Sequence, residues 1–341
     1  MPTAMMPAKR DIAAACARYS GLTRLLGLLP GKPVLAVLNY HRIGNASECP
    51  YDSGVFSATC DELDDQIRFL KKRVRLVALN EAIEIAETQR LRGPAVLLTF
   101  DDGYLDNYQL ALPILSAHGV QAVFFLPASF IGTNRIPWWD AIAFIVKRSR
   151  HPRFLLSYPA PREFDLEAGG VVRAVRTALN LYTSPATQDG ERFIGALEEA
   201  CGVARPDGAQ RCFMSWEEAR SMAQRGMAIG SHSHSHEILS KLSPSRQIDE
   251  LTASKRMIET KTGVPVTAVA YPVGLPESFS PATLAAARTA GYRVGFSFHG
   301  GFNLAGTMDP YSLRRVSVCN PTAARFRLQT TLAAATARYW F

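Results

Sequence analysis

Short apolar runs alternate with helix-like segments along most of this 341-residue chain, and this alternation limits the folds that it can adopt. Continuous apolar runs at 33–40, 95–100 and 121–126 are too short for ordinary helices and have no polar face. Such runs are typical of strands that are buried on both sides, and the segments between them have apolar residues at helical spacing. The pattern therefore predicts an α/β fold, with either a parallel sheet or an α/β barrel.

The spacing of the apolar residues also predicts the other elements. Helices are expected at 57–73, 80–91, 105–118, 215–225, 245–262 and 281–290. Further strands are expected at 74–79, 227–230, 266–271, 292–297 and 313–318. Residues 127–212 are less regular, with helical stretches near 171–182 and 189–201. We therefore predict an N-terminal helical segment (1–32), a barrel (33–320) with a helical insertion at about 137–212, and a C-terminal helix (321–341).

Charge and cysteine content restrict the partners of the chain. The 38 Lys and Arg residues exceed the 30 Asp and Glu residues, and the net charge of +8 suits an anionic partner. No motif combines basic and aromatic residues as nucleic-acid-binding modules do, so we expect no nucleic-acid partner. The six cysteines form no C-x-x-C pair, which argues against a disulfide framework and against zinc held by thiolates.

The N-terminal segment has the composition of an amphipathic helix. Arg18 and Arg24 interrupt its apolar stretches, so we expect no signal peptide and predict a cytoplasmic location. No run in the chain reaches the roughly 18–20 apolar residues of a membrane span. We expect residues 9–29 to pack on the protein, and peripheral contact with the inner face of a membrane is the alternative.

Two polar clusters follow directly after apolar runs. Asp101 and Asp102 come after the run at 95–100, and adjacent carboxylates at a buried strand end repel each other unless a cation lies between them. His232, His234 and His236 come after the run at 227–230. On a helical turn the first and last of these histidines share one face, whereas in an extended segment all three do. One Asp and two His with open positions are typical of a hydrolytic metal site.

At these residues the chain resembles the polysaccharide deacetylases, the carbohydrate esterases that share the NodB homology domain. T-F-D-D-G-Y at 99–104 is similar to their first motif and H-S-x-x-H at 232–236 to their second, and the resemblance extends from about 33 to 318. It implies a distorted (β/α)7 barrel and hydrolysis of an acetamide on a sugar. Asp101 would be the catalytic base. The implied ligands of one divalent ion are Asp102, His232 and His236, and zinc is favoured over cobalt, nickel or iron.

The third family motif, usually R-P-P-Y-G, is A-Y-P-V-G at 270–274. The resemblance implies that the backbone N–H of Val273 binds the oxyanion, with Tyr271 beside it. An alanine replaces the arginine that normally orients the base, and we expect Arg314 or Arg315 to supply the cation instead. The variant motif is similar to that of the biofilm poly-N-acetylglucosamine deacetylases.

The late L-x-H motif, which supplies the general acid in the family, is not evident here. His41 ends the first apolar run and His299 follows the run at 292–297, and either could replace the missing histidine. We favour His41, because the biofilm branch carries its acid at this position. Trp139, in the pair Trp138-Trp139, is a candidate for stacking against a sugar ring.

The sequence thus predicts a metal-dependent hydrolase that removes N-acetyl groups from an N-acetylhexosamine-containing bacterial polysaccharide or its precursor. Two alternatives stay open at this point. One is an amidohydrolase of a small non-sugar amide on the same scaffold, and the other is a non-catalytic glycan-binding protein. The sugar, its linkage and the oligomeric state are not specified by the sequence.

Overall fold

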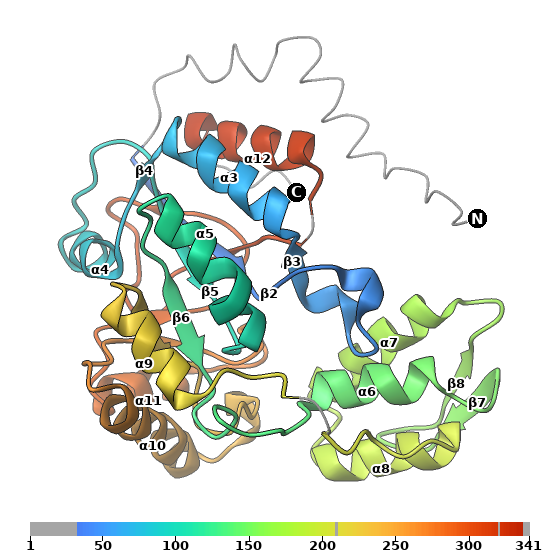
Figure 1. Ribbon diagram of the computed structural model, residues 1–341. Helices are drawn as coiled ribbons and strands as arrows, with labels where there is room; N and C mark the ends of the chain where they lie inside the picture. The colour runs from blue at the N-terminus through green and yellow to red at the C-terminus, as the bar shows by residue number, and fades with distance from the viewer. Residues whose placement is uncertain (1–32, 209–210, 320, 337–341) are drawn as a thin grey trace.

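The computed structural model describes residues 33–208, 211–319 and 321–336 (Figure 1). The helical segment predicted for 1–32 lies outside the described residues. Among the described helices, none combines the length and the apolar character needed to cross a membrane.

The parallel strands form a distorted barrel. Its strands are β1 (Val34–Tyr40), β5 (Ala95–Phe100), β6 (Val123–Leu126), β9 (Ala228–Ser231), β10 (Ala268–Ala270), β11 (Val294–Phe296) and β13 (Val316–Ser317). Neighbours pair in parallel in the order β11-β10-β9-β6-β5-β1, and β13 pairs in parallel with the other side of β1. A parallel bridge between Phe296 and Leu313 joins β11 to the segment before β13. Within the described residues the ring therefore closes, which confirms the predicted α/β fold of the NodB type.

Shorter strands border the barrel. β4 (Arg75–Leu76) pairs in parallel with β5, and β12 (Asn303–Leu304) pairs antiparallel with β1. β2 (Arg42–Ile43) and β3 (Phe56–Ala58) form a separate parallel pair directly after β1. The 3-10 turns η1 (Ala46–Glu48) and η2 (Ser53–Val55) lie between these two strands.

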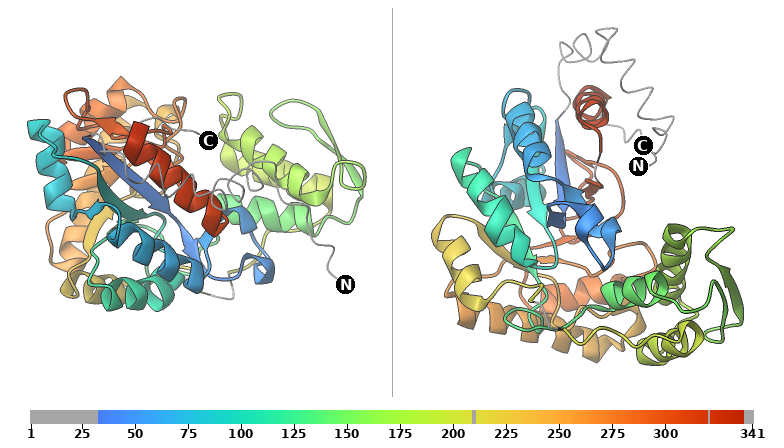
Figure 2. Two further views of the ribbon diagram at one scale, coloured as in Figure 1. Left: turned by 90° about the horizontal axis from the view of Figure 1, so that it is seen from above. Right: turned by 45° about the vertical axis from the view of Figure 1, so that its right-hand side comes forward.

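Helices cover the outside of the barrel, as the alternation predicts (Figures 1 and 2). They are α3 (Cys60–Lys71), α4 (Leu79–Thr88), α5 (Leu112–Ala117), α9 (Trp216–Gln224), α10 (Pro244–Thr262) and α11 (Pro281–Thr289). Reciprocal capping boxes begin α3 and α9, with Thr59 and Ser215 as the N-cap residues. The C-terminal helix α12 (Ala323–Thr336) packs against α3.

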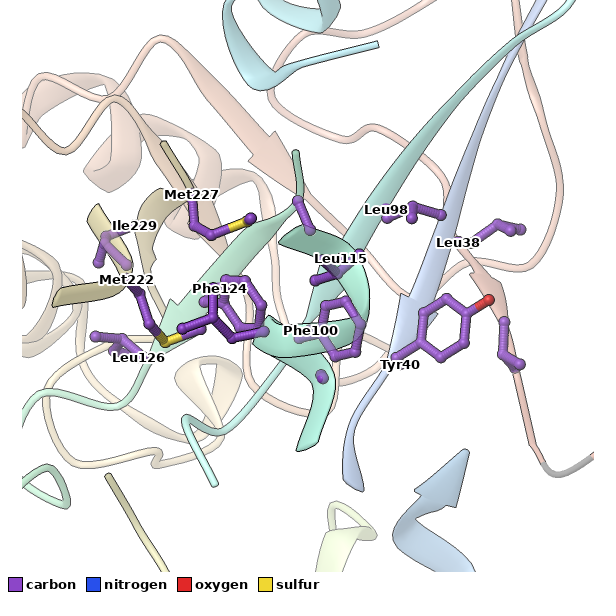
Figure 3. Packing of buried hydrophobic residues seen from close by; sticks show 14 of the residues in the cluster. Leu38, Tyr40, Leu98, Phe100, Leu115, Phe124, Leu126, Met222, Met227 and Ile229 are labelled. Carbon is purple, nitrogen blue, oxygen red and sulfur yellow. The ribbon is translucent and has the colours of Figure 1, made fainter. Parts of the chain in front are cut away.

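Alternate residues of each strand face two different cores. Tyr40, Phe100 and Phe124 stack side by side under the outer helices, with ring centroids 5.0 and 4.8 Å apart (Figure 3). Residues with the opposite parity, such as Leu35 and Leu97, fill the barrel interior. The same alternation of side chains extends to the carboxyl ends of β1 and β5. Alternate polar residues at these ends therefore point toward the barrel interior as well. This register places the site at the carboxyl end of the barrel.

The insertion forms a lobe beside the barrel with a hydrophobic core of its own (Figure 1). It consists of α6 (Trp138–Lys147), α7 (Val171–Thr183), α8 (Gly190–Cys201) and a hairpin of β7 (Arg153–Leu156) and β8 (Arg162–Asp165). The two helices expected near 171–182 and 189–201 are present. The hairpin was not predicted, because its strands are short and prolines precede the first strand and separate the two.

Four predicted elements differ from the structure. The helix expected at 57–73 begins only at Cys60, because residues 56–58 form β3 and Thr59 is the N-cap residue of α3. The helix expected at 105–118 starts as a π-helix, η3 (Asn107–Ala111), and continues as α5. The strand expected at 74–79 ends early because Ala78 already serves as the N-cap residue of α4. The strand expected at 313–318 is interrupted because the N–H of Arg314 donates to the side chain of Asn303 at 2.8 Å rather than to a neighbouring strand.

Candidate active site

Asp102 occupies a strained turn at the carboxyl end of β5. Its φ is +71°, a left-handed conformation that few non-glycine residues adopt, and Gly103 follows with φ of +65°. A Cβ atom on Gly103 would lie 2.7 Å from the end of the Ile131 side chain and 2.8 Å from the end of the Leu126 side chain, so glycine fits this left-handed turn without strain and without displacing either side chain. The turn explains why the first motif needs its glycine directly after the two aspartates.

Asp102, His232 and His236 bring three buried ligand atoms together. These atoms all lie within 4.8 Å of one another, and Asp102 Oδ1 is 3.4 Å from His232 Nε2 and 3.3 Å from His236 Nε2. Asp102 Oδ1 is buried, and no hydrogen-bond donor reaches it among the described residues. His232 Nδ1 bonds the carbonyl of Ala270 at 2.8 Å, which leaves Nε2 facing the carboxylate. An orphaned carboxylate oxygen beside two imidazoles fits a divalent cation.

The segment that carries the two histidines is neither a helical turn nor an extended strand, so it differs from both conformations considered for it. Ser233 and His236 have φ of +61° and +59°, and the Ser233 hydroxyl accepts the N–H of His236 at 3.1 Å. Glu250 on α10 accepts the N–H groups of His234 and Ser235 at 3.0 and 2.8 Å. These side-chain contacts turn the chain back on itself and bring His232 and His236 together. His234 lies outside the ligand group.

Asp101 is held by two donors on the barrel side of the site. Arg315 Nη1 donates to Asp101 Oδ1 at 2.8 Å, and Asn39 Nδ2 donates to Oδ2 at 3.2 Å. Burial raises the pKa of the Asp101 carboxyl, but the positive charges of Arg315 and His232 outweigh it, so the net direction is downward. The carboxyl is therefore held as a carboxylate in a fixed orientation, as a general base requires. Of the two arginines expected to supply a cation here, Arg315 contacts Asp101, and Arg314 is exposed.

A cavity of about 210 Å³ opens over these groups. Its lining includes every residue predicted for the site: His41, Asp101, Asp102, Trp139, His232, His236, Tyr271, Val273 and Arg315. Asp52, Val55, Trp138, Leu179 and Phe298 complete the lining. His299, the alternative acid, is not part of the lining and packs against Phe279 instead, with ring centroids 5.2 Å apart.

The residues of the third motif reach the cavity in different ways. Val273 has φ of +63°, a strained conformation for a β-branched residue, and it lines the cavity. Gly274 follows with φ of +65°, and its Cβ would lie 2.7 Å from the backbone nitrogen of Phe298. Tyr271 is fully buried, and its hydroxyl donates to the carbonyl of Tyr311 at 2.8 Å, so this group is already paired.

Trp139 packs against His236, one of the three candidate ligands. Its ring lies 4.5 Å from that of His236, and its Nε1–H donates to the hydroxyl of Tyr104 at 2.7 Å. Only 5% of its surface is exposed, so little of the ring is open to a sugar. Trp138, its neighbour, is less buried and stacks on Tyr182 with centroids 4.2 Å apart.

Comparison with known proteins agrees with this geometry. The family model described as "Polysaccharide deacetylase" matches residues 88–295, which is more than half of the chain. The chain belongs to the polysaccharide deacetylase family. YxkH of Bacillus subtilis, which is named for the same family, is 24% identical over 286 residues, covering 83% of this chain and 71% of its own.

Solved structures of deacetylases share the fold. The deacetylase PplD of Streptococcus pyogenes superposes with a TM-score of 0.56 at 19% identity, over 87% of this chain and 97% of its own. IcaB of Ammonifex degensii gives 0.55 at 21% identity, over 88% of this chain and 97% of its own. At this level of identity, the likeness to these two structures establishes the architecture of the barrel.

Three residues of the site were missed by the sequence reasoning. Asn39 lies inside an otherwise apolar run, and a buried amide at a strand end was a signal that could have identified it. Glu250 has the appearance of an ordinary helical residue, so nothing in the sequence marks its role. Asp52 lies in a loop whose position over the cavity depends on α6, because its N–H donates to the buried carboxyl of Asp140 at 3.0 Å.

Proposed function

We propose that this protein is a metal-dependent N-deacetylase of an N-acetylhexosamine-containing bacterial polysaccharide or its precursor. The observation that carries the proposal is the juxtaposition of a three-ligand group, with an orphaned Asp102 oxygen, and the Asp101 carboxylate that Arg315 orients. The reaction adds water to an acetamide and releases acetate and a free amine. Membership of the family and the deacetylase names of its structural relatives support the reaction class.

Asp102, His232 and His236 would hold the divalent ion. When bound, such an ion supplies Lewis acidity toward the acetamide oxygen and lowers the pKa of water. Zinc suits this ligand set, and cobalt, nickel and iron are accepted by the same donors. Metal analysis of the purified protein, with thermal melting before and after metal is added, tests this assignment independently of activity.

The remaining groups divide the proton transfers between them. Asp101 accepts a proton from the attacking water, and Arg315 with Asn39 keeps its carboxylate oriented for that step. The N–H of Val273 is the proposed donor to the oxyanion of the tetrahedral intermediate. His41, on the cavity lining, is the proposed acid that donates a proton to the leaving amine.

The assay measures amine release from N-acetylglucosamine oligomers of increasing length, with chelator and with metal restored. We expect chelation to abolish release and metal to restore it, and Asp101→Asn to lose at least about 100-fold in kcat. Full activity in Asp101→Asn would overturn the mechanism.

A panel of cyclic imides and ureides tests the alternative that the substrate is a small non-sugar amide. An inert, metal-free protein that binds glycans would support the alternative of a non-catalytic glycan-binding protein.

We also propose the cytoplasmic location and a peripheral contact with anionic membrane surfaces. The support is the net charge of +8 and the chemistry of a lipid-linked precursor as substrate. Binding to vesicles of anionic and neutral lipid at graded salt concentration tests the contact. Equal binding to both kinds of vesicle would argue against an electrostatic contact.

A further inference from the structure

We propose that Asn107 and Ser57 are positioning residues for His41, and that they hold this histidine in place for proton donation to the leaving amine. The inference rests on the proposed function, in which His41 is the general acid. It concerns side chains that touch neither the metal ligands nor the base. None of them was singled out by the sequence motifs.

Both backbone polar groups of His41 are bound by buried side chains. Its N–H donates to the Ser57 hydroxyl at 2.9 Å, and its carbonyl accepts from Asn107 Nδ2 at 2.7 Å. Ser57 and Asn107 are 2% and 0% exposed. His41 lies between β1 and β2, where no strand supplies these two bonds. The position of its imidazole therefore depends on these two side chains.

The next two residues are held by the neighbour of Asn107. Asp106 Oδ2 pairs with Arg42 Nε at 2.8 Å, and Asp106 Oδ1 accepts the N–H of Ile43 at 3.0 Å. The guanidinium of Arg42 also lies over the rings of Phe56 and Tyr104, with centroids 4.5 and 4.8 Å away. The chain just after the first barrel strand is thus fixed on both its backbone and its side chains.

Two of the holding residues, Asp106 and Asn107, belong to the segment that carries the base and a proposed metal ligand. Asp106 and Asn107 follow Asp101-Asp102 by a few residues, at the start of the π-helix η3. π-Helical turns are rare and occur frequently at functional sites. Because one segment bears both the base and the donor to His41, it fixes the separation of acid and base across the cavity. Effective proton transfer depends on that separation, since small displacements lower rates steeply.

The amide of Asn107 is costly if its role is only structural. Its Oδ1 is buried, and no donor reaches it among the described residues. An unsatisfied buried acceptor costs about 1–3 kcal/mol, and an apolar side chain of similar size would avoid this cost. What the amide supplies that leucine cannot is a donor to the carbonyl of His41 and to Asp106 Oδ1, at 2.7 and 3.1 Å, and Asp106 in turn holds Arg42 and Ile43. Retention of asparagine here is therefore better explained by the placement of His41 than by packing.

A double-mutant cycle tests the inference on the full-length, metal-loaded protein. Asn107→Leu, His41→Ala and the double variant are assayed for amine release from an N-acetylglucosamine oligomer. If Asn107 acts through His41, Asn107→Leu lowers kcat roughly 10- to 100-fold in the wild-type background, with KM nearly unchanged. In the His41→Ala background the same change has little further effect. Equal losses in both backgrounds would overturn the proposal.

An aryl acetate provides the second readout. Its phenolate leaves without protonation, whereas the amine of an acetamide must be protonated, so a misplaced acid lowers amide turnover far more than ester turnover. We expect Asn107→Leu and the milder Ser57→Ala to lower the amide-to-ester ratio, as His41→Ala does. Asp101→Asn, in contrast, should lower both activities.

Gln247→Ala is the matched control. This buried amide on α10 also donates to a backbone carbonyl, that of Leu242 at 2.9 Å, but it does not line the cavity. Its loss should lower the melting temperature and leave the amide-to-ester ratio unchanged. If Gln247→Ala and Asn107→Leu change the ratio equally, the positioning role is wrong. If wild-type protein cleaves neither substrate, the proposed function fails first, which distinguishes the two failures.

Discussion

Arg315 and Asp101 form a buried ion pair between residues that are 214 positions apart in the sequence. The side chains are 1% and 2% exposed, and the same Arg315 Nη1 also donates to Asn39 at 3.0 Å. Its Nε donates to the carbonyl of Ser297, so the guanidinium bridges three positions of the barrel. We infer that this cation takes the part of the arginine that the third motif usually carries, where this chain has Ala270. The orienting cation would then come from the segment just before β13.

Replacing Arg315 should damage both stability and turnover. Arg315→Met leaves the Asp101 carboxylate buried without its cation, and such a loss costs about 3–5 kcal/mol of unfolding free energy. We expect kcat to fall by roughly 100-fold or more, because the base loses its orienting donor. Arg315→Lys keeps the charge but not the planar, forked guanidinium, so its kcat should lie between those of the wild type and Arg315→Met. Arg314→Met is the control, since the side chain of Arg314 is exposed and donates to the carbonyl of Gly300 at a long 3.4 Å. Wild-type turnover in Arg315→Met would refute the assigned role.

The two outer histidines of the second motif should differ from the middle one in metal affinity. Zinc added at 100 times its dissociation constant stabilises a folded protein by about 2.7 kcal/mol. We expect this shift in wild-type protein and in His234→Ala, because His234 lies outside the ligand group. His236→Ala should lose it, since the buried Asp102 oxygen then retains only one imidazole partner. Thermal melting with and without zinc measures the shift, and an unchanged shift in His236→Ala would exclude the proposed ligand set.

Gly274 should be required for the geometry of the oxyanion donor. Gly274→Ala introduces a Cβ 2.7 Å from the backbone of Phe298, which cannot move as a flexible side chain can. The left-handed backbone conformation costs alanine about 1–2 kcal/mol of folding stability. Displacement of Val273 should lower kcat by at least about 10-fold. Gly291→Ala has a similar φ of +78° but meets no atom within 4 Å, so it isolates the strain from the clash. Equal kcat values for the two variants would show that the close approach has no role in catalysis.

The parts of the fold and the site that depend on local sequence could be predicted. Each motif follows a run of apolar residues, and a parallel sheet brings the carboxyl ends of such runs together. Asp101 and His232 could therefore be placed at one site before their distance was known. For the orienting cation, the sequence predicted Arg314 or Arg315 but not which of the two. The register of a two-residue strand decides which of these adjacent residues faces inward.

Residues that act through distant contacts could not be predicted. Glu250 binds the backbone of the histidine segment from α10, and its role depends on how that helix packs on the barrel. The conformation around His236 likewise follows from contacts with side chains and not from its own periodicity. The role of Asn107 could not be predicted because it lies in a π-helical turn, whereas the spacing of apolar residues indicated an ordinary helix there. Long-range packing decides each of these cases.

Asp140 should make the stability of the protein depend on pH. This residue of α6 is fully buried, and its Oδ2 has no hydrogen-bond partner among the described residues. Burial raises the pKa of Asp140 to about 7, although the N–H of Asp52 opposes the rise. In the unfolded chain the pKa of an aspartate is about 3.9. Between these two pKa values the folded state retains a proton that the unfolded state has released. The stability that this proton contributes is therefore complete below about pH 4 and is lost as the pH rises through 7.

Asp140→Asn removes the titration and keeps the acceptor for the N–H of Asp52. Near pH 4 the variant and the wild type should have similar free energies of unfolding. At pH 8 the variant should be more stable by a few kcal/mol, since each pKa unit corresponds to about 1.4 kcal/mol. Urea unfolding across this pH range measures the difference. Asp249→Asn, at an exposed position on α10, should show no such divergence. If the wild-type and Asp140→Asn curves run parallel from pH 4 to pH 8, Asp140 is ionised in the folded protein and the burial argument is wrong.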